Sequence, residues 1–235
     1  MIRLVKSPIL VLFHGVAHTE IIPISHANTH NPKMESSQIP IPTPIPSPII
    51  TTPLFQIRPY HPSDVTSCTA AINSNSPLIA KYMRNTFPNP ATLAGTETWI
   101  QTCMEATFSP REILINYAIV SGDEFIGSLG FKPMKDIEYR TFEIGYWVRH
   151  ESWGKGIMTA AVREFVRWGF ETFPELERIE AQVFDDNEAS AKVLTKAGFL
   201  FEGARRRAGY KPTLGGLFDI RMYGVTKGDV FGDKA

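Results

Sequence analysis

The stretch EIGYWVRHESWGKGIMTAAVREFVRWGF, residues 143–170, decides the fold of this chain. Its first part continues an alternation of apolar side chains that begins at 140, which predicts a strand over 140–149. Apolar residues then recur at helical spacing, which predicts a helix over 155–172. Between the two, Gly154 and Gly156 flank Lys155. The question is which function requires two glycines and a lysine in a strand-to-helix turn.

Backbone amides in the first turn of a helix have no partner within the helix, and they lie at the positive end of its dipole. Glycines let a phosphate approach these amides without a Cβ in the way. Two common phosphate loops do not match, because Gly156 stands where a P-loop needs Ser or Thr and Thr159 stands where a dinucleotide loop needs its third glycine. The turn therefore predicts a phosphate or pyrophosphate site of another kind.

The rest of the chain alternates in type. Strands are predicted over 54–58, 113–120, 125–133, 178–184, 199–208 and 216–225, and helices over 62–74, 77–84, 96–107 and 187–198. Both faces of 140–149 are partly apolar, as expected of a central strand that is covered on both sides. This order predicts an α/β fold whose antiparallel front half is followed by a strand–helix–strand–helix unit.

The N-terminal part has a different composition. Within 31–53, proline recurs at every second position from 40 to 48, which excludes a helix or a central strand and predicts an extended linker. We therefore predict an extension and linker over 1–53, a folded domain over 54–228 and a tail over 229–235. Early basic residues make 1–30 either an organelle-targeting sequence or a disordered extension, and Met34 offers an alternative start.

The charge balance restricts the partners. Lys and Arg total 24, as do Asp and Glu, so nucleic acid and anionic membranes are not expected as partners. No apolar run approaches the roughly 20 residues of a membrane span. The two cysteines, Cys68 and Cys103, match no disulfide framework or metal-ligand spacing. We expect reduced thiols, no metal and a cytoplasmic location.

Three segments resemble one family. The turn is similar to the acyl-CoA loop of the GNAT acetyltransferases, [Q/R]-x-x-G-x-[G/A], with Glu151 where Gln or Arg is usual. YWVRHESWGKGIMTAA (146–161), NEASAKVLTKAGFLFEG (187–203) and FDIRMYGV (218–225) resemble the RimJ/RimL branch of ribosomal-protein N-terminal acetyltransferases. The resemblance implies a GNAT fold, a mixed and mostly antiparallel sheet of six to seven strands flanked by helices. That sheet would splay between 140–149 and 178–184, and acetyl-CoA would be the co-substrate.

The same resemblance implies where acetyl-CoA would bind. The pantetheine arm would lie beside the backbone of Trp147 and Val148. Asn187 would contact the pantetheine, cap the following helix, or do both, since Asn is a favoured N-cap. Ser190 would face the sulfur or simply be a small residue of the first helical turn. The pyrophosphate would be held by the amides of Trp153, Gly154, Lys155, Gly156, Ile157 and Met158, with Thr159 nearby.

The implied reaction is acetyl transfer to a primary amine of a protein N-terminus or a small molecule, in a ternary complex. Glu143 is the expected base, with an ion pair to Arg140 or another arginine as the alternative. The usual acid, a tyrosine, is replaced by Leu194, so Ser190 is the expected acid. Tyr146 and Tyr223 are weaker candidates for that acid. Leu194 also motivates the alternative of a non-catalytic acyl-CoA-binding module.

The remaining expectations concern the acceptor side and the surface. The segments 85–97 and 208–216 are expected to set acceptor specificity, and the protein is expected to be a monomer or a homodimer. The basic cluster of Arg205 to Arg207 and Lys211 indicates either a solvated strand face or a surface that attracts anions, such as an acidic substrate or the CoA phosphates. His150 is expected to be exposed. Four aromatic residues are expected in the core or along an acyl channel: Tyr146, Trp147, Trp153 and Phe199.

Overall fold

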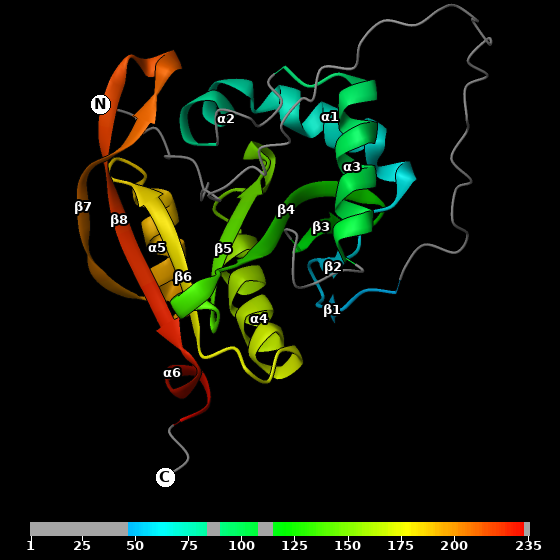
Figure 1. Cartoon of the computed structure of the whole chain (residues 1–235). Helices are drawn as coiled ribbons and strands as arrows, with labels where there is room; N and C mark the ends of the chain where they lie inside the picture. Colours follow the sequence, from blue (N-terminus) through cyan, green and yellow to red (C-terminus); the bar gives the residue numbers. More distant parts are fainter. Residues whose placement is uncertain (1–46, 84–89, 108–114, 233–235) are drawn as a thin grey trace, which may run out of the picture.

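The computed structural model describes residues 47–83, 90–107 and 115–232 (Figure 1). The strands are β1 (Ile50–Thr51), β2 (Gln56–Arg58), β3 (Ile115–Ser121), β4 (Glu124–Pro133), β5 (Thr141–Val148), β6 (Arg178–Phe184), β7 (Leu200–Lys211) and β8 (Gly216–Thr226). The helices are α1 (Val65–Ser74), α2 (Ser76–Tyr82), α3 (Leu93–Thr107), α4 (Ile157–Thr172), α5 (Glu188–Ala197) and α6 (Lys227–Phe231). The predicted targeting sequence, most of the proline-rich linker and residues 85–89 of the predicted acceptor loop lie outside the described residues.

The strands form one sheet in the order β1-β2-β3-β4-β5-β6-β8-β7. Every neighbouring pair is antiparallel except β5 and β6, which are parallel. The predicted mixed, mostly antiparallel sheet is confirmed, but it has eight strands rather than six or seven. The additional strand is β1, within the range predicted as linker. The prolines end at Pro48, so the amide of Ile49 is able to donate to Ile57 O at 2.9 Å and start the pairing.

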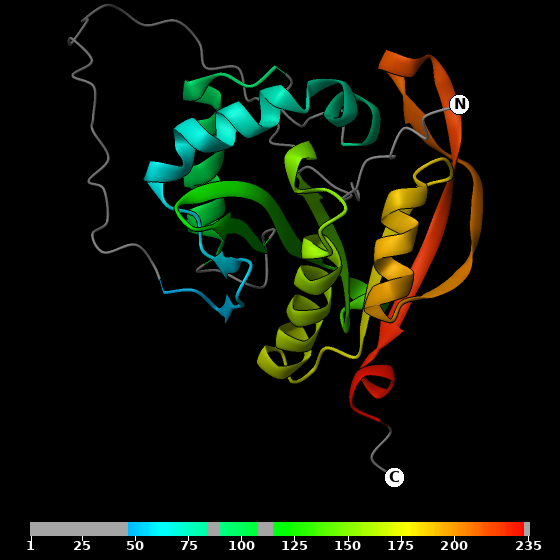
Figure 2. The ribbon, with the colours of Figure 1, turned by 180° about the vertical axis from the view of Figure 1, so that it is seen from behind.

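Both faces of the sheet are covered, as predicted from the apolar residues on both sides of β5. On one face α4 and α5, seen side by side in Figure 2, enclose a core with Phe131, Ile144 and Phe165. On the other face α1, α2 and α3 enclose a second core that includes Tyr60 and Trp147. The two cysteines are confirmed as free, buried thiols.

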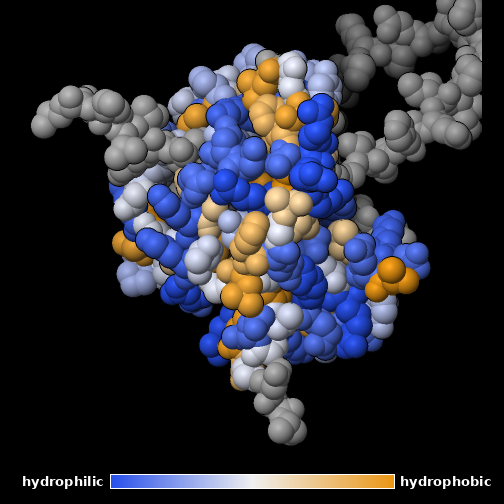
Figure 3. Space-filling model, turned by 90° about the vertical axis from the view of Figure 1, so that its left-hand side faces the viewer, coloured by the Kyte–Doolittle hydropathy of each residue, from blue (hydrophilic) through white to orange (hydrophobic). Residues whose placement is uncertain are grey.

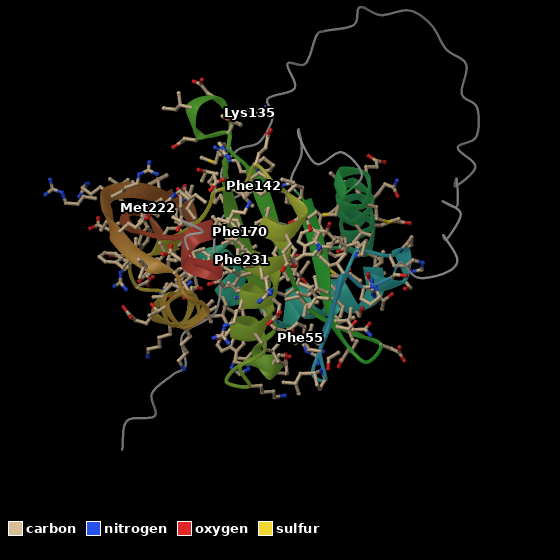
Figure 4. The ribbon with its side chains drawn as sticks, turned by 90° about the horizontal axis from the view of Figure 1, so that it is seen from below. Phe55, Lys135, Phe142, Phe170, Met222 and Phe231 are labelled. Atoms are coloured by element: carbon tan, nitrogen blue, oxygen red, sulfur yellow. The ribbon has the colours of Figure 1, made fainter. Side chains whose placement is uncertain are left out.

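The segment after β8 is part of the fold rather than a tail. Thr226 and Asp229 form a reciprocal capping box that starts α6. The ring of Phe231 then lies against Phe170 of α4, with the ring centroids 6.4 Å apart (Figure 4), and under the guanidinium of Arg167. The predicted boundary at 229 is therefore wrong, because a capped turn and an aromatic contact hold this segment onto α4.

The β7–β8 hairpin forms one edge of the sheet and is longer than predicted. Figure 3 shows its side of the molecule, where hydrophobic and hydrophilic residues are mixed. Phe201 of β7 is one of the exposed large apolar residues. Arg205, Arg206 and Arg207 are exposed, as expected of a solvated strand face. Lys211 is not part of that face. Its side chain is buried and its Nζ donates to the carbonyl oxygen of Met83, which ties the hairpin to the end of α2.

Two further observations apply to the part of the chain that the structure describes. It contains no helix long and apolar enough to cross a membrane. Nor do its His, Cys, Asp and Glu side chains gather into a group of three or more that is suited to a metal ion.

Candidate active site

The central feature of the site is the separation of β5 from β6. Their parallel pairing covers only the three residues of β5 from Thr141 to Glu143. Beyond Glu143, β5 remains paired with β4 as far as Val148, while β6 remains paired with β8 as far as Phe184. The predicted splay is therefore present, and among the described residues one edge of β5 from Ile144 onward faces no strand (Figure 1).

Hydrogen bonds at the two ends of β5 show which backbone groups line this open edge. The amide of Arg149 donates to Ile126 O, and Thr141 O accepts from the amide of Met134, both at 2.9 Å and both toward β4. Backbone groups alternate in direction along a strand and the β4–β5 register is continuous, so odd-numbered residues face β4 and even-numbered ones face the gap. The open edge thus carries the backbone groups of Ile144, Tyr146 and Val148.

This alternation corrects one prediction and refines another. The backbone of Trp147 pairs toward Ser128 of β4 and is turned away from the gap, so its predicted pantetheine contact is wrong. The carbonyl of Val148 accepts from the indole Nε1 of Trp153 at 3.0 Å, which leaves its amide directed into the gap. The open edge therefore presents the backbone groups of Tyr146 in addition to the amide of Val148. Which residues of a strand turn their backbone groups toward each side depends on how the neighbouring strands pair with it, so the sequence alone did not reveal this.

The glycine turn after β5 has the geometry that its composition predicted. Gly154 and Gly156 adopt positive φ, 73° and 76°, a region that glycine enters without the steric cost of a Cβ. Gly156 is the N-cap of α4 and provides no side chain to cap it, and the first helical bond runs from the amide of Ala160 to Gly156 O. The amides of Ile157, Met158 and Thr159 therefore precede that first bond, beside the exposed residues 154–156. This helix start is suited to an anion.

The residues before the glycines hold the turn in place. The amide of Trp153 donates to His150 O at 3.0 Å, so the predicted contact of this amide with a pyrophosphate is wrong. The amide of His150 in turn donates to Oδ1 of Asn75 at 2.8 Å, and Nδ2 of Asn75 donates to Ala71 O at 2.7 Å. Asn75 is buried at the junction of α1 and α2 and links that junction to the turn. The His150 side chain is exposed, as predicted.

On the α4–α5 side of the gap, α5 begins next to β5. Oδ1 of Asn187 accepts from the amide of Ser190 at 3.2 Å, which confirms the predicted N-cap, whereas its contact with a cofactor stays a prediction. The hydroxyl of Tyr146 donates to Ser190 O at 3.3 Å. Burial raises the pKa of Tyr146 well above the ordinary value of 10, so its phenol keeps its proton. Leu194 lies in the core.

On the opposite face of β5 lies Glu143, which is fully buried. Its Oε2 is 3.7 Å from Nζ of Lys132, its register neighbour on β4. The alternative of an ion pair with Arg140 is corrected here, since Arg140 pairs with Glu177 at 2.9 Å, whereas an ion pair with another arginine stays a prediction. Glu143 therefore combines a carboxylate, a nearby cation and a position where the two strands separate.

Two polar residues of β6 share that face and were not singled out from the sequence. Glu180 is the register partner of Glu143 and lies 3.4 Å from Arg178. Gln182 follows two residues later and is only 4% exposed. Polar residues at alternate positions of the apolar strand RIEAQVF were the signal for both. Lys132 gave a similar signal in the strand 125–133.

The model of the acetyltransferase (GNAT) domain matches residues 55–200, more than half of this chain. The chain belongs to the GNAT acetyltransferase family. An uncharacterized N-acetyltransferase, p20 of Bacillus licheniformis, is 33% identical to this GNAT protein over 159 residues, 67% of this chain and 85% of the relative. The ribosomal-protein-serine acetyltransferase of Escherichia coli is 30% identical over 92 residues, 39% of this chain and 50% of the relative.

Solved structures agree on the fold. RimJ of Mycobacterium smegmatis, in complex with a CoA-disulfide, superposes with a TM-score of 0.67 at 23% identity, over 75% of this chain and 84% of RimJ. The microcin C7 self-immunity acetyltransferase MccE, in complex with acetyl-CoA and AMP, gives a TM-score of 0.65 at 20% identity, over 74% of this chain and 93% of MccE. The predicted GNAT fold is confirmed. The family and the curated relatives make this GNAT protein an N-acetyltransferase.

Proposed function

We propose that this GNAT acetyltransferase transfers the acetyl group of acetyl-CoA directly to a primary amine in a ternary complex. The observation that carries the proposal is that Glu143 and Tyr146 lie on opposite faces of β5, at the point where β6 separates from it. A base is thus available on one side of the gap and a protonated hydroxyl on the other. Acetyl transfer to an amine needs both, because the nucleophile loses a proton and the thiolate gains one.

The cofactor half of the site follows from the open backbone. The pantetheine arm would extend the sheet along β5 and bond the backbone of Tyr146 and Val148 in place of the missing strand. The pyrophosphate would lie on the first-turn amides of α4, beside Lys155 and Thr159. The amide of Val148 would then donate to the thioester oxygen as it becomes negative, a contact typically worth about 10²–10³ in rate.

The acceptor would enter from the Glu143 side. Amines have pKa values of roughly 8 to 10, so near pH 7 the acceptor arrives as an ammonium and Glu143 takes a proton from it. The neutral nitrogen attacks the thioester carbon, the C–S bond breaks and CoA leaves as a thiolate. The nitrogen gives up its second proton as the amide forms, so that of the two protons lost by the ammonium one ends on the CoA sulfur and one is released to water. Before the amine binds, Nζ of Lys132, 3.7 Å from Oε2 of Glu143, balances the negative charge of this buried carboxylate.

The proton for the thiolate would come from the hydroxyl of Tyr146 or from that of Ser190. The Tyr146 hydroxyl contacts the backbone carbonyl oxygen of Ser190 on the α5 side of the gap, where the sulfur of a pantetheine along β5 would point. Leu194 motivated the alternative of a non-catalytic module, since it replaces the usual acid. Tyr146, which comes from a different element, β5, would supply an acid in place of the usual tyrosine. Leu194 then no longer argues for a non-catalytic module.

For the acceptor, the favoured class is the α-amino group of a protein. The Escherichia coli relative is named for a ribosomal-protein serine, and the RimL structure found to be similar is named for the α-amino group of L7/L12. Small-molecule amines remain the second class to test.

The deciding experiment follows free thiol release by the full chain with acetyl-CoA and a panel of acceptors. The panel contains peptides that differ in their first residue, polyamines, amino acids and aminoglycosides. Acceptor-dependent release is expected, with peptides as the best acceptors. If acetyl-CoA binds tightly in the same samples and no acceptor provokes release, the protein is a binding module and the proposal fails.

A further inference from the structure

Gln182 lies on β6 at the place where β5 departs. Glu180 is the register partner of Glu143, and Gln182 follows on the same face about 7 Å further along the strand. On its other side Gln182 is paired with Met222 of β8, which is labelled in Figure 4. Gln182 is therefore a diagonal neighbour of Glu143, and it borders the acceptor side of the gap.

The side-chain amide of Gln182 is buried, yet its oxygen lacks a hydrogen-bond donor among the described residues. Its side chain is 4% exposed, and its Oε1 has no hydrogen-bond partner among the residues that the structure describes. The positions next to it on this face do not share that state: Glu180 is paired with Arg178, and Phe184 packs in the apolar core. A buried carbonyl without a donor is costly, and most such groups in folded proteins have a partner. The missing donor is therefore expected from a ligand.

We infer that Gln182 accepts a hydrogen bond from the acceptor amine and orients it for attack, an inference that rests on the proposed function. An ammonium has three N–H groups, and after Glu143 removes one proton the nitrogen retains two and gains a lone pair. Diagonal neighbours on a sheet lie about 7–8 Å apart, a span that one nitrogen with two hydrogen bonds of about 2.9 Å can bridge. Holding one N–H on Gln182 stops rotation about the C–N bond, so the lone pair stays directed at the thioester.

The first test is Gln182→Leu, a change that removes the amide and keeps the volume. The KM for the acceptor should rise about tenfold, as expected for one lost hydrogen bond, while the Kd for acetyl-CoA should not change. The melting temperature should stay level or rise, because Oε1 of Gln182 has no hydrogen bond to the described residues that the change could remove. A purely structural role predicts the reverse, a lower melting temperature with an unchanged KM, and that result would overturn the inference. Gln101→Leu, on the exposed side of α3, is the matched control and should alter none of these values.

A binding measurement separates this inference from the proposed function. The probe is CoA joined through an acetyl bridge to the α-nitrogen of the peptide Ser-Ala-Ala-Ala, with CoA alone as the reference. Calorimetry should show that Gln182→Leu weakens the conjugate about tenfold and leaves CoA unchanged. Equal effects on both ligands, or none, reject a role for Gln182. An enzyme without turnover whose conjugate affinity still depends on Gln182 would reject the proposed function alone. If the leucine variant does not fold, Gln182→Met serves the same test.

Discussion

The hydroxyl of Tyr146 donates to the carbonyl oxygen of Ser190 at 3.3 Å and so joins the open edge of β5 to the first turn of α5. These residues lie on the two elements between which a pantetheine arm would pass. Their contact puts a buried, protonated phenol where a CoA thiolate would form. With Tyr146 as the proposed acid, the leucine at position 194 would be accounted for, because a different element of the fold would supply the proton.

Replacing Tyr146 with Phe should lower kcat about 10- to 100-fold, near the lower end for general acids because a thiolate leaves readily. Pre-steady-state thiol release would measure this. Burial raises the pKa of Tyr146 above 10, so in the wild type kcat should not fall through loss of this proton until the pH exceeds 10. Tyr117→Phe is the control, since this buried tyrosine lies in the same core on β3. An equal loss in both variants would mean that the effect comes from packing.

Replacing Glu143 with Gln should lower kcat/KM for the amine about 10²–10⁴-fold, the usual range for a general base. The affinity for acetyl-CoA should be retained, because the proposed cofactor contacts are backbone groups of β5 and α4, which the substitution leaves in place. The same change at Glu177, which forms an exposed ion pair with Arg140, should have little effect on rate or stability. Unchanged turnover in Glu143→Gln would exclude Glu143 as the base.

Gly156→Ala should weaken acetyl-CoA binding and destabilise the protein by about 1–2 kcal/mol, the cost of a left-handed conformation for an L residue. The added Cβ meets nothing within 4 Å, so backbone strain is the cause rather than a clash. Gly215 provides the control, with φ of 66° and equally open surroundings at the tip of the β7–β8 hairpin. Gly215→Ala should show a similar fall in melting temperature with an unchanged Kd. A Kd that is equally altered in both variants would contradict a cofactor role for the turn.

Asn75→Ala should destabilise the protein by about 3 kcal/mol, since it removes three side-chain hydrogen bonds worth about 1 kcal/mol each. One of them holds His150 and hence the glycine turn, so the Kd for acetyl-CoA should also rise. Asn73 forms two comparable bonds to Ala91 without touching the turn. Asn73→Ala should therefore lower stability alone, and chemical denaturation with calorimetry distinguishes the two effects. A Kd that stays constant in Asn75→Ala would show that the turn holds its shape without this tether.

Local parts of the site were predictable from the sequence. Gly154 and Gly156 were recognised because a strand-to-helix turn with positive φ selects glycine, and Asn187 because a helix start selects a capping oxygen. The order of elements and the central position of β5 followed from hydrophobic period, and the splay from the resemblance to the family. The short β1 was missed because its two residues follow directly on the prolines, and α6 because it is a single capped turn.

The sequence by itself therefore determined the elements, the glycine turn, the family and Glu143 as a candidate base. Only the tertiary structure decided what surrounds them: Lys132 beside Glu143, Tyr146 against Ser190, Asn75 holding His150, and the unpartnered oxygen of Gln182. The physical reason is that these relationships depend on strand register and on which way each strand is turned. Both are set by pairing between strands as distant in sequence as β2 and β3, where Gln56 is paired with Val120, which no local pattern records.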